Sequence, residues 1–356
     1  MAERGTRMLI VVIILALLAS LACWYGIARA PAPGGINQLE QVELGGVRQW
    51  ISIRGAKPQA PVLLFLHGGP GSANLAKLRL QAPGLEQHFV VVNWDQSGAG
   101  KSASLGFDYG RLSIEQMVSD AHELVTYLKA RFRVEKIYLM GFSWGTVIGL
   151  SLAARYPEDF QAFISVSQEV NPAEGERISL EYVRQKAAQA GDRRAITALA
   201  GIDPAYRSPD WFQQLSTERN WLLHYGGVYH TASSYSHELW MLLKAHEYSL
   251  AEVSLWPGRS SASLKQLWPA VMQVNFFETV PVVDCPVYFF VGRFDNNAPG
   301  QLTEAYYQKV KAPAGKQLVW FENSAHDIFY DEPQRLEQEV LAVLKEQSGG
   351  GYVVHE

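Results

Sequence analysis

The chain has 356 residues, 48% of them hydrophobic, and a formal net charge of −4. This length and composition can bury one large core together with a sizeable insertion, which favours one compound domain over two independent ones. The charge is small and no long basic run occurs, so a nucleic acid is a poor candidate partner. With only two cysteines, Cys23 and Cys285, the chain has no disulfide framework.

The N-terminus begins with an apolar segment. Residues 8–28 carry no charge, and a helix of this length can cross a bilayer. Arg4 and Arg7 precede the segment and favour an N-terminus in the cytoplasm, with the body of the protein outside. We therefore expect residues 1–30 to form a membrane anchor. The alternatives are a cleaved signal peptide, which would release a secreted or periplasmic protein, and lipidation of Cys23.

Beyond this segment, apolar strands alternate with helices. The pattern around Gly45-Gly46 predicts a hairpin over residues 41–54. Short apolar runs between turn residues predict buried strands at 61–66, 89–94, 137–140, 160–166, 286–291 and 317–321. Helical periodicity and capping residues predict helices at 113–132, 146–156 and 333–344. The alternation indicates an α/β fold, with a mostly parallel sheet covered by helices on both faces.

The loop at residues 96–102 ends in Gly-Lys-Ser, as nucleotide-binding loops do. A Walker loop also requires a glycine at the position that Asp95 occupies, which excludes that interpretation. We expect a tight loop at the rim of the active site instead. The histidines show no metal-ligand spacing with acids, so no metal and no cofactor is predicted. His67 is expected to brace the glycine-rich loop that follows it.

The segment 136–156 reads as a short strand, a serine between glycines, and a helix. Its G-x-S-x-G motif, residues 141–145, is typical of a nucleophile elbow, in which only glycine fits two residues either side of the serine. Ser143 would then lie at the strand tip. The amide of Trp144, at the N-terminus of the helix, would point toward developing negative charge. The motif also occurs by chance, but the strand before it and the helix after it favour the elbow.

The strand pattern stops between residues 169 and 284. Helical, aromatic-rich sequence replaces it, and we interpret this segment as a lid over the site. It contains five tryptophans: Trp211, Trp221, Trp240, Trp256 and Trp268. The expected division is an α/β core in two parts, 31–168 and 285–348, a helical cap at 169–284 and a flexible tail at 349–356.

A nucleophilic serine needs a base, and the base needs a carboxylate that orients it. Ligand sites in parallel sheets gather at the carboxyl ends of the strands. Asp295 follows the strand that ends near residue 291, and His326 follows the strand that ends near residue 321. The order Ser143, Asp295, His326 is that of α/β-hydrolases. Asp284 and Asp327 are the alternatives for the carboxylate.

Several motifs together resemble the proline iminopeptidase branch of the α/β-hydrolase superfamily. They are LHGGPGS at 66–72, NWDQSGAGKS at 93–102, GFSWGT at 141–146, GRFD at 292–295 and SAHD at 324–327. The resemblance implies that Ser143 is the nucleophile, that His326 is the base, and that Asp295 orients the imidazole of His326. It also implies an oxyanion hole made by the amides of Gly69 and Trp144, with Gly68 as a weaker candidate.

Two residues depart from the family pattern. Ser97 stands where arginine is common, and Ala325 stands where glycine usually precedes the histidine; neither change removes a catalytic group. The resemblance implies a serine hydrolase that releases N-terminal proline or another small residue from peptides. A carboxylesterase or lipase-like enzyme acting on acyl esters is the alternative, and a non-catalytic binding module on the same fold is the third reading. The expected partner is a small peptide or ester substrate.

The start of the cap is acidic. A free N-terminus carries a positive charge, and its burial is costly unless an acidic group meets it. Glu169, Glu174 and Glu176 all lie within eight residues of one another there. A solvated, helix-starting acidic run is the alternative interpretation. Because members of the resembled family place acidic lid residues at the amine, we expect Glu176 first, and Glu169 second, to bind the substrate amine.

Overall fold

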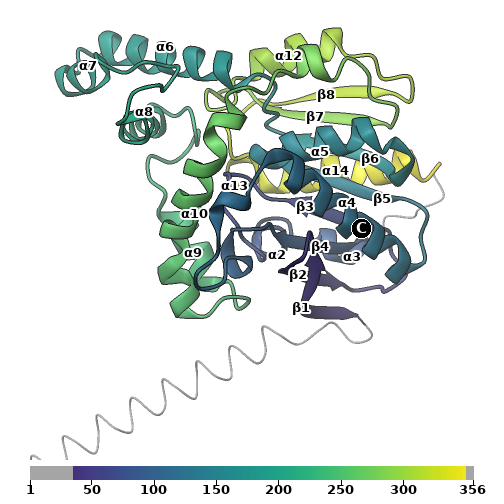
Figure 1. Ribbon diagram of the computed structural model, residues 1–356. Coiled ribbons are helices and arrows are strands. Elements are labelled where there is room, and N and C mark those ends of the chain that lie inside the picture. The colour runs from purple at the N-terminus through teal and green to yellow at the C-terminus, as the bar shows by residue number, and fades with distance from the viewer. Residues whose placement is uncertain (1–34, 350–356) are drawn as a thin grey trace, which may run out of the picture.

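An eight-stranded sheet runs through the protein, for which a computed structural model describes residues 35–349 (Figure 1). The strand order is β1-β2-β4-β3-β5-β6-β7-β8. The strands are β1 (Ile36–Leu44), β2 (Val47–Gly55), β3 (Val62–Leu66), β4 (Val90–Asp95), β5 (Ile137–Phe142), β6 (Phe160–Val166), β7 (Val287–Gly292) and β8 (Lys316–Phe321). The pairs β1–β2 and β2–β4 are antiparallel, and every later pair is parallel. The predicted α/β fold is confirmed.

The central strands are apolar throughout because helices cover both faces of the sheet. In β3 every residue is buried, and successive side chains enter different cores: Leu64 and Leu66 join one hydrophobic cluster, whereas Leu63 and Phe65 join the other. Side chains alternate between the two faces of a strand, so both faces must be lined with apolar residues.

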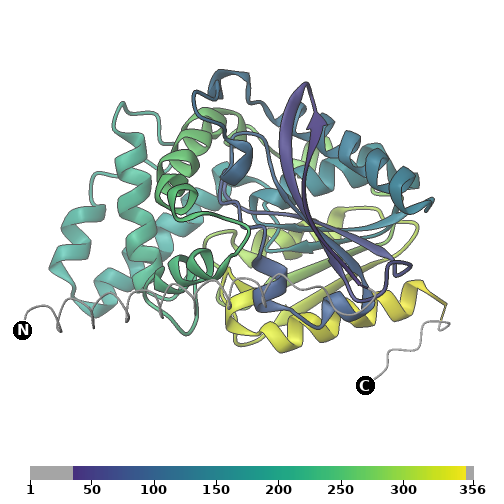
Figure 2. The ribbon, with the colours of Figure 1, turned by 90° about the horizontal axis from the view of Figure 1, so that it is seen from below.

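The covering helices form two layers (Figure 2). Helices α4 (Ile114–Phe132), α5 (Trp144–Arg155) and α12 (Gly300–Lys309) contribute side chains to the first cluster. Helices α2 (Lys77–Gln81), α3 (Leu85–His88), α13 (Ile328–Asp331) and α14 (Pro333–Gln347) contribute to the second. Short 3-10 helices lie at Gly100–Ser102, Tyr109–Arg111 and Pro157–Asp159. The hydroxyl of Ser113 accepts a hydrogen bond from the amide of Gln116 (3.1 Å) and so caps α4, as the sequence predicts.

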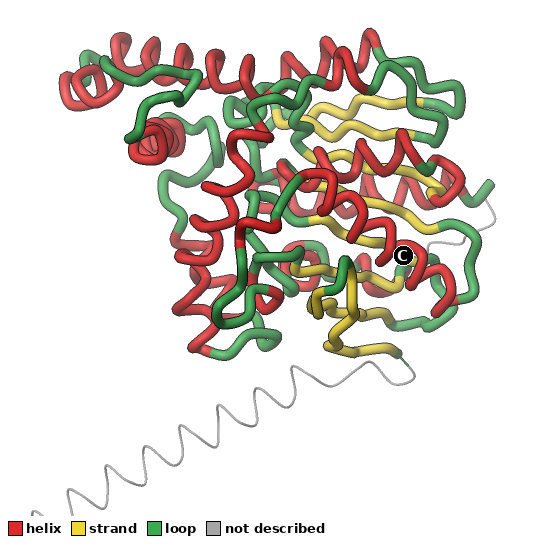
Figure 3. The backbone as a smooth tube through the Cα atoms, viewed as in Figure 1, coloured by secondary structure: helices red, strands yellow, loops and turns green. Residues whose placement is uncertain are grey.

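Six helices stand between β6 and β7, and we call them the helical insertion. They are α6 (Pro172–Ala190), α7 (Arg193–Leu199), α8 (Trp211–His224), α9 (Ser236–Lys244), α10 (Leu250–Val271) and α11 (Phe276–Thr279). Figure 3 shows most of them gathered to one side of the sheet. The insertion has its own hydrophobic core, which includes Leu180, Leu222 and Trp268. It is also joined to the body, because Leu267 and Val271 of α10 belong to the first cluster of the sheet.

The expectation of a membrane anchor is corrected. Within residues 35–349 there is no helix whose length and apolar character would let it span a bilayer. The longest described helix, α10, carries Glu252, Arg259 and Lys265 along its length, and such charges are costly in hydrocarbon. The predicted location of the catalytic body outside the cytoplasm rested on the anchor and is withdrawn with it. The segment 1–30 lies outside the described residues, as does the predicted tail beyond Gly349.

Two helical glycines offer a test of this packing. A Cβ atom on Gly149 in α5 would lie 2.5 Å from the ring of Phe163, which is fully buried in β6 and cannot yield. A Cβ atom on Gly258 in α10 would meet no described atom within 4 Å. Replacing a helical glycine by alanine otherwise stabilises by roughly 0.5–1 kcal/mol, whereas overpacking costs about 1–3 kcal/mol.

We therefore expect the two alanine substitutions to have opposite effects. Gly149→Ala should lower the free energy of unfolding by about 1–2 kcal/mol, and Gly258→Ala should raise it by up to about 1 kcal/mol. Chemical denaturation of the two variants beside the wild type measures both changes. A Gly149→Ala protein as stable as the wild type would show that α5 does not pack on β6 as described.

Candidate active site

Ser143 lies in a strained turn between β5 and α5. Its φ of 52° and ψ of −121° are sparsely populated for a residue with a side chain. The neighbouring backbones are packed so closely that a Cβ on Gly141 would lie 2.6 Å from the carbonyl oxygen of Gly145. A Cβ on Gly145 would lie 2.1 Å from the carbonyl oxygen of Leu66. Only glycine fits at both positions, which explains the spacing of the sequence motif.

Ser143, His326 and Asp295 form a chain of hydrogen bonds. Nε2 of His326 lies 2.9 Å from Oγ of Ser143, and Nδ1 lies 3.0 Å from Oδ2 of Asp295. The other carboxylate oxygen, Oδ1 of Asp295, accepts hydrogen bonds from the amides of Asn297 and Ala298, both at 2.9 Å. An ionised carboxylate is only a hydrogen-bond acceptor, so Nδ1 of the neutral imidazole must carry the proton and donate it to Asp295. Nε2 is then free to accept a hydrogen bond from the serine hydroxyl. The structure thus brings together the three side chains that the sequence singled out.

The helical insertion holds the loops that carry this chain. The carbonyl oxygen of Val228, between α8 and α9, accepts hydrogen bonds from the amides of His326 (2.9 Å) and Asp327 (3.1 Å). The neighbouring carbonyl of Gly227 accepts from the amide of Asn296 (3.2 Å). Sequence reasoning did not identify this contact, because backbone groups carry no residue-type signal.

The charge around His326 favours its protonated form. Burial lowers the pKa of His326, but the charge and hydrogen bond of Asp295 outweigh that effect. The acidic groups of Glu169 and Asp327 add to it, so the pKa lies above its usual value of 6.5. An imidazole in this setting accepts a proton readily from a neighbouring hydroxyl.

The glycine-rich loop after β3 faces the serine. A Cβ on Gly68 would lie 3.3 Å from Cβ of Ser143, and a Cβ on Gly69, whose φ is 124°, would lie 2.4 Å from the amide nitrogen of Gly71. Gly68, Gly69 and Trp144 line the same cavity as Ser143. Trp144 is the first residue of α5, where backbone amides lack intrahelical partners.

A buried polar network braces this loop. Nδ1 of His67 lies 2.7 Å from the carbonyl oxygen of Gly68, and Nε2 accepts from the amide of Gln96 at 3.2 Å. Burial lowers the pKa of His67 to about 4, so the ring is neutral and donates from Nδ1. The side chain of Gln96 donates to the carbonyl oxygen of His67 and accepts from the indole nitrogen of Trp144 (2.9 Å). The bracing role predicted for His67 is confirmed, and Gln96 extends it to Trp144.

The loop at residues 96–102 connects the sheet to the insertion. Oδ2 of Asp95 accepts from the amide of Lys101, and Oδ1 accepts from the hydroxyl of Tyr248, both at 2.7 Å. From α10, Arg259 donates to the carbonyl oxygen of Gly100 and Ser263 donates to that of Gly98, both at 2.8 Å. Asp95, at the position that excluded a Walker loop, therefore holds a tight loop on which α10 is seated.

A cavity of about 620 Å³ lies over Ser143, between the core loops and the helical insertion. One part of its wall is polar and carries Glu169, Glu176, Arg219, Glu238 and Asp327. Another part is apolar and carries Leu215, Met241, Leu242, Val253, Trp256 and Leu264. A ligand at Ser143 therefore meets charged groups in some directions and hydrocarbon in others.

Glu176 is already paired with a cation. Arg219 forms ion pairs with Glu176 and with Glu218. Burial raises the pKa of Glu176, and the positive charge of Arg219 opposes the shift. The second oxygen, Oε2, and the hydroxyl of Tyr206 are buried near each other without a well-formed hydrogen bond to any described residue. Sequence reasoning missed Arg219 because it lies in α8, whereas Glu176 lies in α6, and only the packing of the two helices brings the side chains together.

Glu169 has a different environment. It follows β6, is half-buried and lines the cavity, and its carboxylate forms no ion pair or hydrogen bond with the described residues 35–349. Burial raises the pKa of Glu169 to about 8; the positive form of His326 opposes the shift, while Glu176 and Asp295 add to it. The carboxylate of Glu169 is therefore available to a cation that enters the cavity.

Comparison with known proteins gives consistent matches. Residues 61–333 match the model of the alpha/beta hydrolase fold family. The "Probable aminopeptidase YbaC" of Bacillus subtilis (strain 168) is 29% identical over 310 residues, which cover 85% of this chain and 95% of the relative. A proline iminopeptidase of Heyndrickxia coagulans is 24% identical over 294 residues, which cover 79% of this chain and 88% of the relative.

A solved structure agrees in fold. The crystal structure of proline iminopeptidase from Mycobacterium smegmatis superposes with a TM-score of 0.65 and covers 88% of this chain and 100% of that one. The sequence identity is 17%, so this likeness concerns the fold alone.

The electrostatics of His326 can be measured directly. In Asp295→Asn the burial of the imidazole is unchanged, but the negative charge that outweighs it is lost. The pKa of His326 should therefore fall by at least about one unit, since an adjacent opposite charge typically shifts a pKa by 1–3 units. Nuclear magnetic resonance titration of the histidine ring in both proteins gives the two values. An unchanged or higher pKa in the variant would show that Asp295 does not govern the ring.

Proposed function

The chain belongs to the α/β-hydrolase fold family, and on that premise we propose that it is a serine hydrolase acting through Ser143, His326 and Asp295. We propose further that it is an aminopeptidase, which releases an N-terminal residue, with proline or another small residue as the leading candidate. The observation that carries the proposal is the pair of hydrogen bonds leading from Oγ of Ser143 through the imidazole to the carboxylate. The names of the aminopeptidase relatives agree with the resemblance drawn from the motifs.

In the proposed mechanism, Oγ of Ser143 attacks the substrate carbonyl carbon while Nε2 of His326 takes its proton. Asp295 holds the ring and stabilises the imidazolium that forms. The tetrahedral intermediate collapses when the same proton passes from Nε2 to the leaving amine, which departs and leaves an acyl group on Ser143. A water molecule then attacks the acyl group, again with His326 as the base, and restores the serine.

The amides of Gly69 and Trp144 are proposed to bind the oxyanion of that intermediate. Both residues line the cavity beside Ser143, and the network of His67 and Gln96 fixes the loop and the indole relative to each other. Donors that are fixed before the reaction need no reorganisation as charge develops, which is why such sites contribute strongly to the rate.

The substrate amine is proposed to bind Glu169. Of the two glutamates favoured by the sequence, Glu176 forms an ion pair with Arg219, whereas Glu169 lines the cavity and forms no ion pair with the described residues. An ammonium group beside Glu169 favours its ionised form and so lowers its raised pKa. This contrast supports proposing Glu169 ahead of Glu176 as the amine-binding residue, the reverse of the order expected from the sequence.

The helical insertion is proposed to act as the lid that shapes the substrate site. An esterase acting on acyl esters is the second candidate function, and the apolar wall made by α9 and α10 favours it, since an acyl chain would pack there. The two candidates differ in whether a positive charge on the substrate is recognised.

Charge recognition is tested with a matched pair of substrates, proline p-nitroanilide and p-nitrophenyl butyrate. We expect the wild type to hydrolyse the free-amine substrate, and Ser143→Ala to hydrolyse neither. In Glu169→Gln the ratio of kcat/KM for proline p-nitroanilide over that for the butyrate should fall about 10- to 100-fold, because a hydrogen bond between charged groups contributes roughly 1.5–3 kcal/mol. The control is Glu174→Gln, a partly exposed residue that pairs with Arg177, and this change should keep the ratio.

Equal loss on both substrates in Glu169→Gln would mean that the change only disturbs the site. A wild type that prefers the butyrate, together with an unchanged ratio in Glu169→Gln, would favour the esterase.

A further inference from the structure

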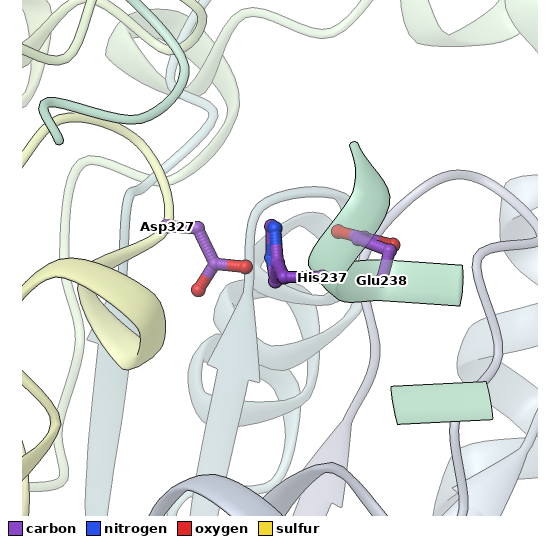
Figure 4. A group of neighbouring side chains, drawn as sticks. All are labelled: His237, Glu238 and Asp327. Atoms are coloured by element: carbon purple, nitrogen blue, oxygen red, sulfur yellow. The ribbon is translucent and has the colours of Figure 1, made fainter. Parts of the chain in front are cut away.

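A second group of polar side chains lies at the cavity wall, which two of its three members, Glu238 and Asp327, line. His237 and Glu238 come from α9, and Asp327 comes from the loop after β8 (Figure 4). One atom of each, a ring nitrogen or a carboxylate oxygen, lies within 4.8 Å of the others. Figure 4 shows His237 between the two carboxylates. None of the hydrolytic steps proposed above uses these three side chains.

The group has unused hydrogen-bonding capacity. Both ring nitrogens of His237 and Oδ1 of Asp327 are buried without a hydrogen-bond partner in the described part of the chain. Asp327 is only 2% exposed. Such buried polar atoms normally have a partner, and leaving one unpaired typically costs about 1–3 kcal/mol. The other atoms are satisfied: Lys77 donates to Oδ2 of Asp327, and Tyr229 donates to Oε1 of Glu238, both at 2.9 Å.

The charges around the group favour a positively charged ligand. Burial lowers the pKa of His237, with the acidic neighbours opposing the shift, so the ring is neutral at pH 7 and offers a lone pair. Three acidic side chains, Glu238, Asp327 and the nearby Asp331, act on His237, and Lys77 is the opposing positive charge. The group would therefore attract a ligand with a positive charge.

The spacing suits a primary ammonium group. Such a group has three N–H donors in a tetrahedral arrangement, and acceptors about 2.9 Å from its nitrogen lie roughly 4.7 Å from one another. The three acceptor atoms here lie within 4.8 Å of one another, close enough for one ammonium nitrogen to contact all of them. The aromatic rings of Tyr330 and Tyr229, whose centroids lie 4.0 Å and 4.4 Å from that of His237, form the adjacent wall. Aromatic faces also attract cations.

The group is also within reach of a substrate held at Ser143. Glu238 and Asp327 line the same cavity as the serine. Asp327 directly follows His326, and the ammonium of Lys77 lies 4.8 Å above the ring of Phe142, the residue before Ser143. A molecule that fills the cavity from the serine to α9 would bring one of its ends to this group.

We propose that His237, Glu238 and Asp327 form a subsite for the side-chain ammonium of a lysine-like residue in the substrate. The inference rests on the proposed function in taking Ser143 as the point where the substrate is held and Glu169 as the residue that binds its α-amine. It assigns the α-amine to Glu169 and the second amino group to this subsite. The substrate class is thus peptides or amides that carry a basic residue.

The test uses two ligands that differ in one charge. Nα-acetyl-lysine amide and Nα-acetyl-norleucine amide share a four-carbon side chain, which ends in an ammonium group only in the lysine ligand, and neither has a free α-amine. Isothermal titration calorimetry with the full-length Ser143→Ala protein, in which no turnover occurs, should give a Kd at least about tenfold lower for the lysine ligand. Adding Glu238→Gln should remove most of that preference. Glu278→Gln, an equal change of charge at an exposed residue of α11, should preserve it.

Equal Kd values for the two ligands would overturn the proposal. So would a lysine preference that survives both Glu238→Gln and His237→Phe. Asp327 is left intact, because its replacement would leave the buried ammonium of Lys77 without its ion-pair partner. If the lysine ligand shows no preference but Zn²⁺ binds and His237→Phe abolishes that binding, the group is a metal site instead. Neither ligand is hydrolysed, so this outcome is independent of the p-nitroanilide assay, in which failure of the peptidase proposal would appear.

Discussion

The position of Ser143 depends on the close approach of three backbone segments. The strand β5, the start of α5 and the end of β3 meet so tightly that a single methyl group at Gly141 or Gly145 would overlap a carbonyl oxygen. This contact holds the serine in a backbone conformation that side chains disfavour, and the buried sheet on both sides keeps it there. Loops from β7 and β8 then need only to bring a carboxylate and an imidazole to the same edge of the sheet.

The helical insertion also positions the loops at the edge of the sheet that carry the site. Its backbone at Gly227 and Val228 holds the loops of Asp295 and His326, while α10 rests on the loop that Asp95 fixes. It also supplies much of the cavity wall. The insertion is therefore part of the site, because its backbone hydrogen bonds help to position the loops that carry Asp295 and His326.

Acidic groups surround the serine, and their partners decide what each can do. Asp295 is committed to the imidazole, Glu176 to Arg219, and one oxygen of Asp327 to Lys77. The carboxylate of Glu169 and the unpaired oxygen of Asp327 are left facing the region where a ligand would lie. The arrangement of charge thus favours ligands with amino groups, in line with the aminopeptidase proposal.

Much of this arrangement could be predicted from the sequence, because local patterns have local causes. Apolar runs marked the strands, the glycines marked the elbow, and chain order at strand ends pointed to Asp295 and His326. The pairing of Glu176 with Arg219 could not be predicted, since it depends on how α6 and α8 pack. The meeting of His237 with Asp327 likewise joins residues far apart in the chain. The membrane anchor was inferred from an uncharged segment and the arginines before it, and no helix of residues 35–349 supports it.

Peptide mapping by mass spectrometry, after reaction with a fluorophosphonate, tests the central claim most directly. A hydroxyl activated by His326 should attack the phosphorus, so the account predicts one adduct, on Ser143, and loss of hydrolysis in proportion to its formation. A folded Ser143→Ala protein should form no adduct. Labelling at another residue together with loss of activity, or normal hydrolysis by Ser143→Ala, would contradict the account.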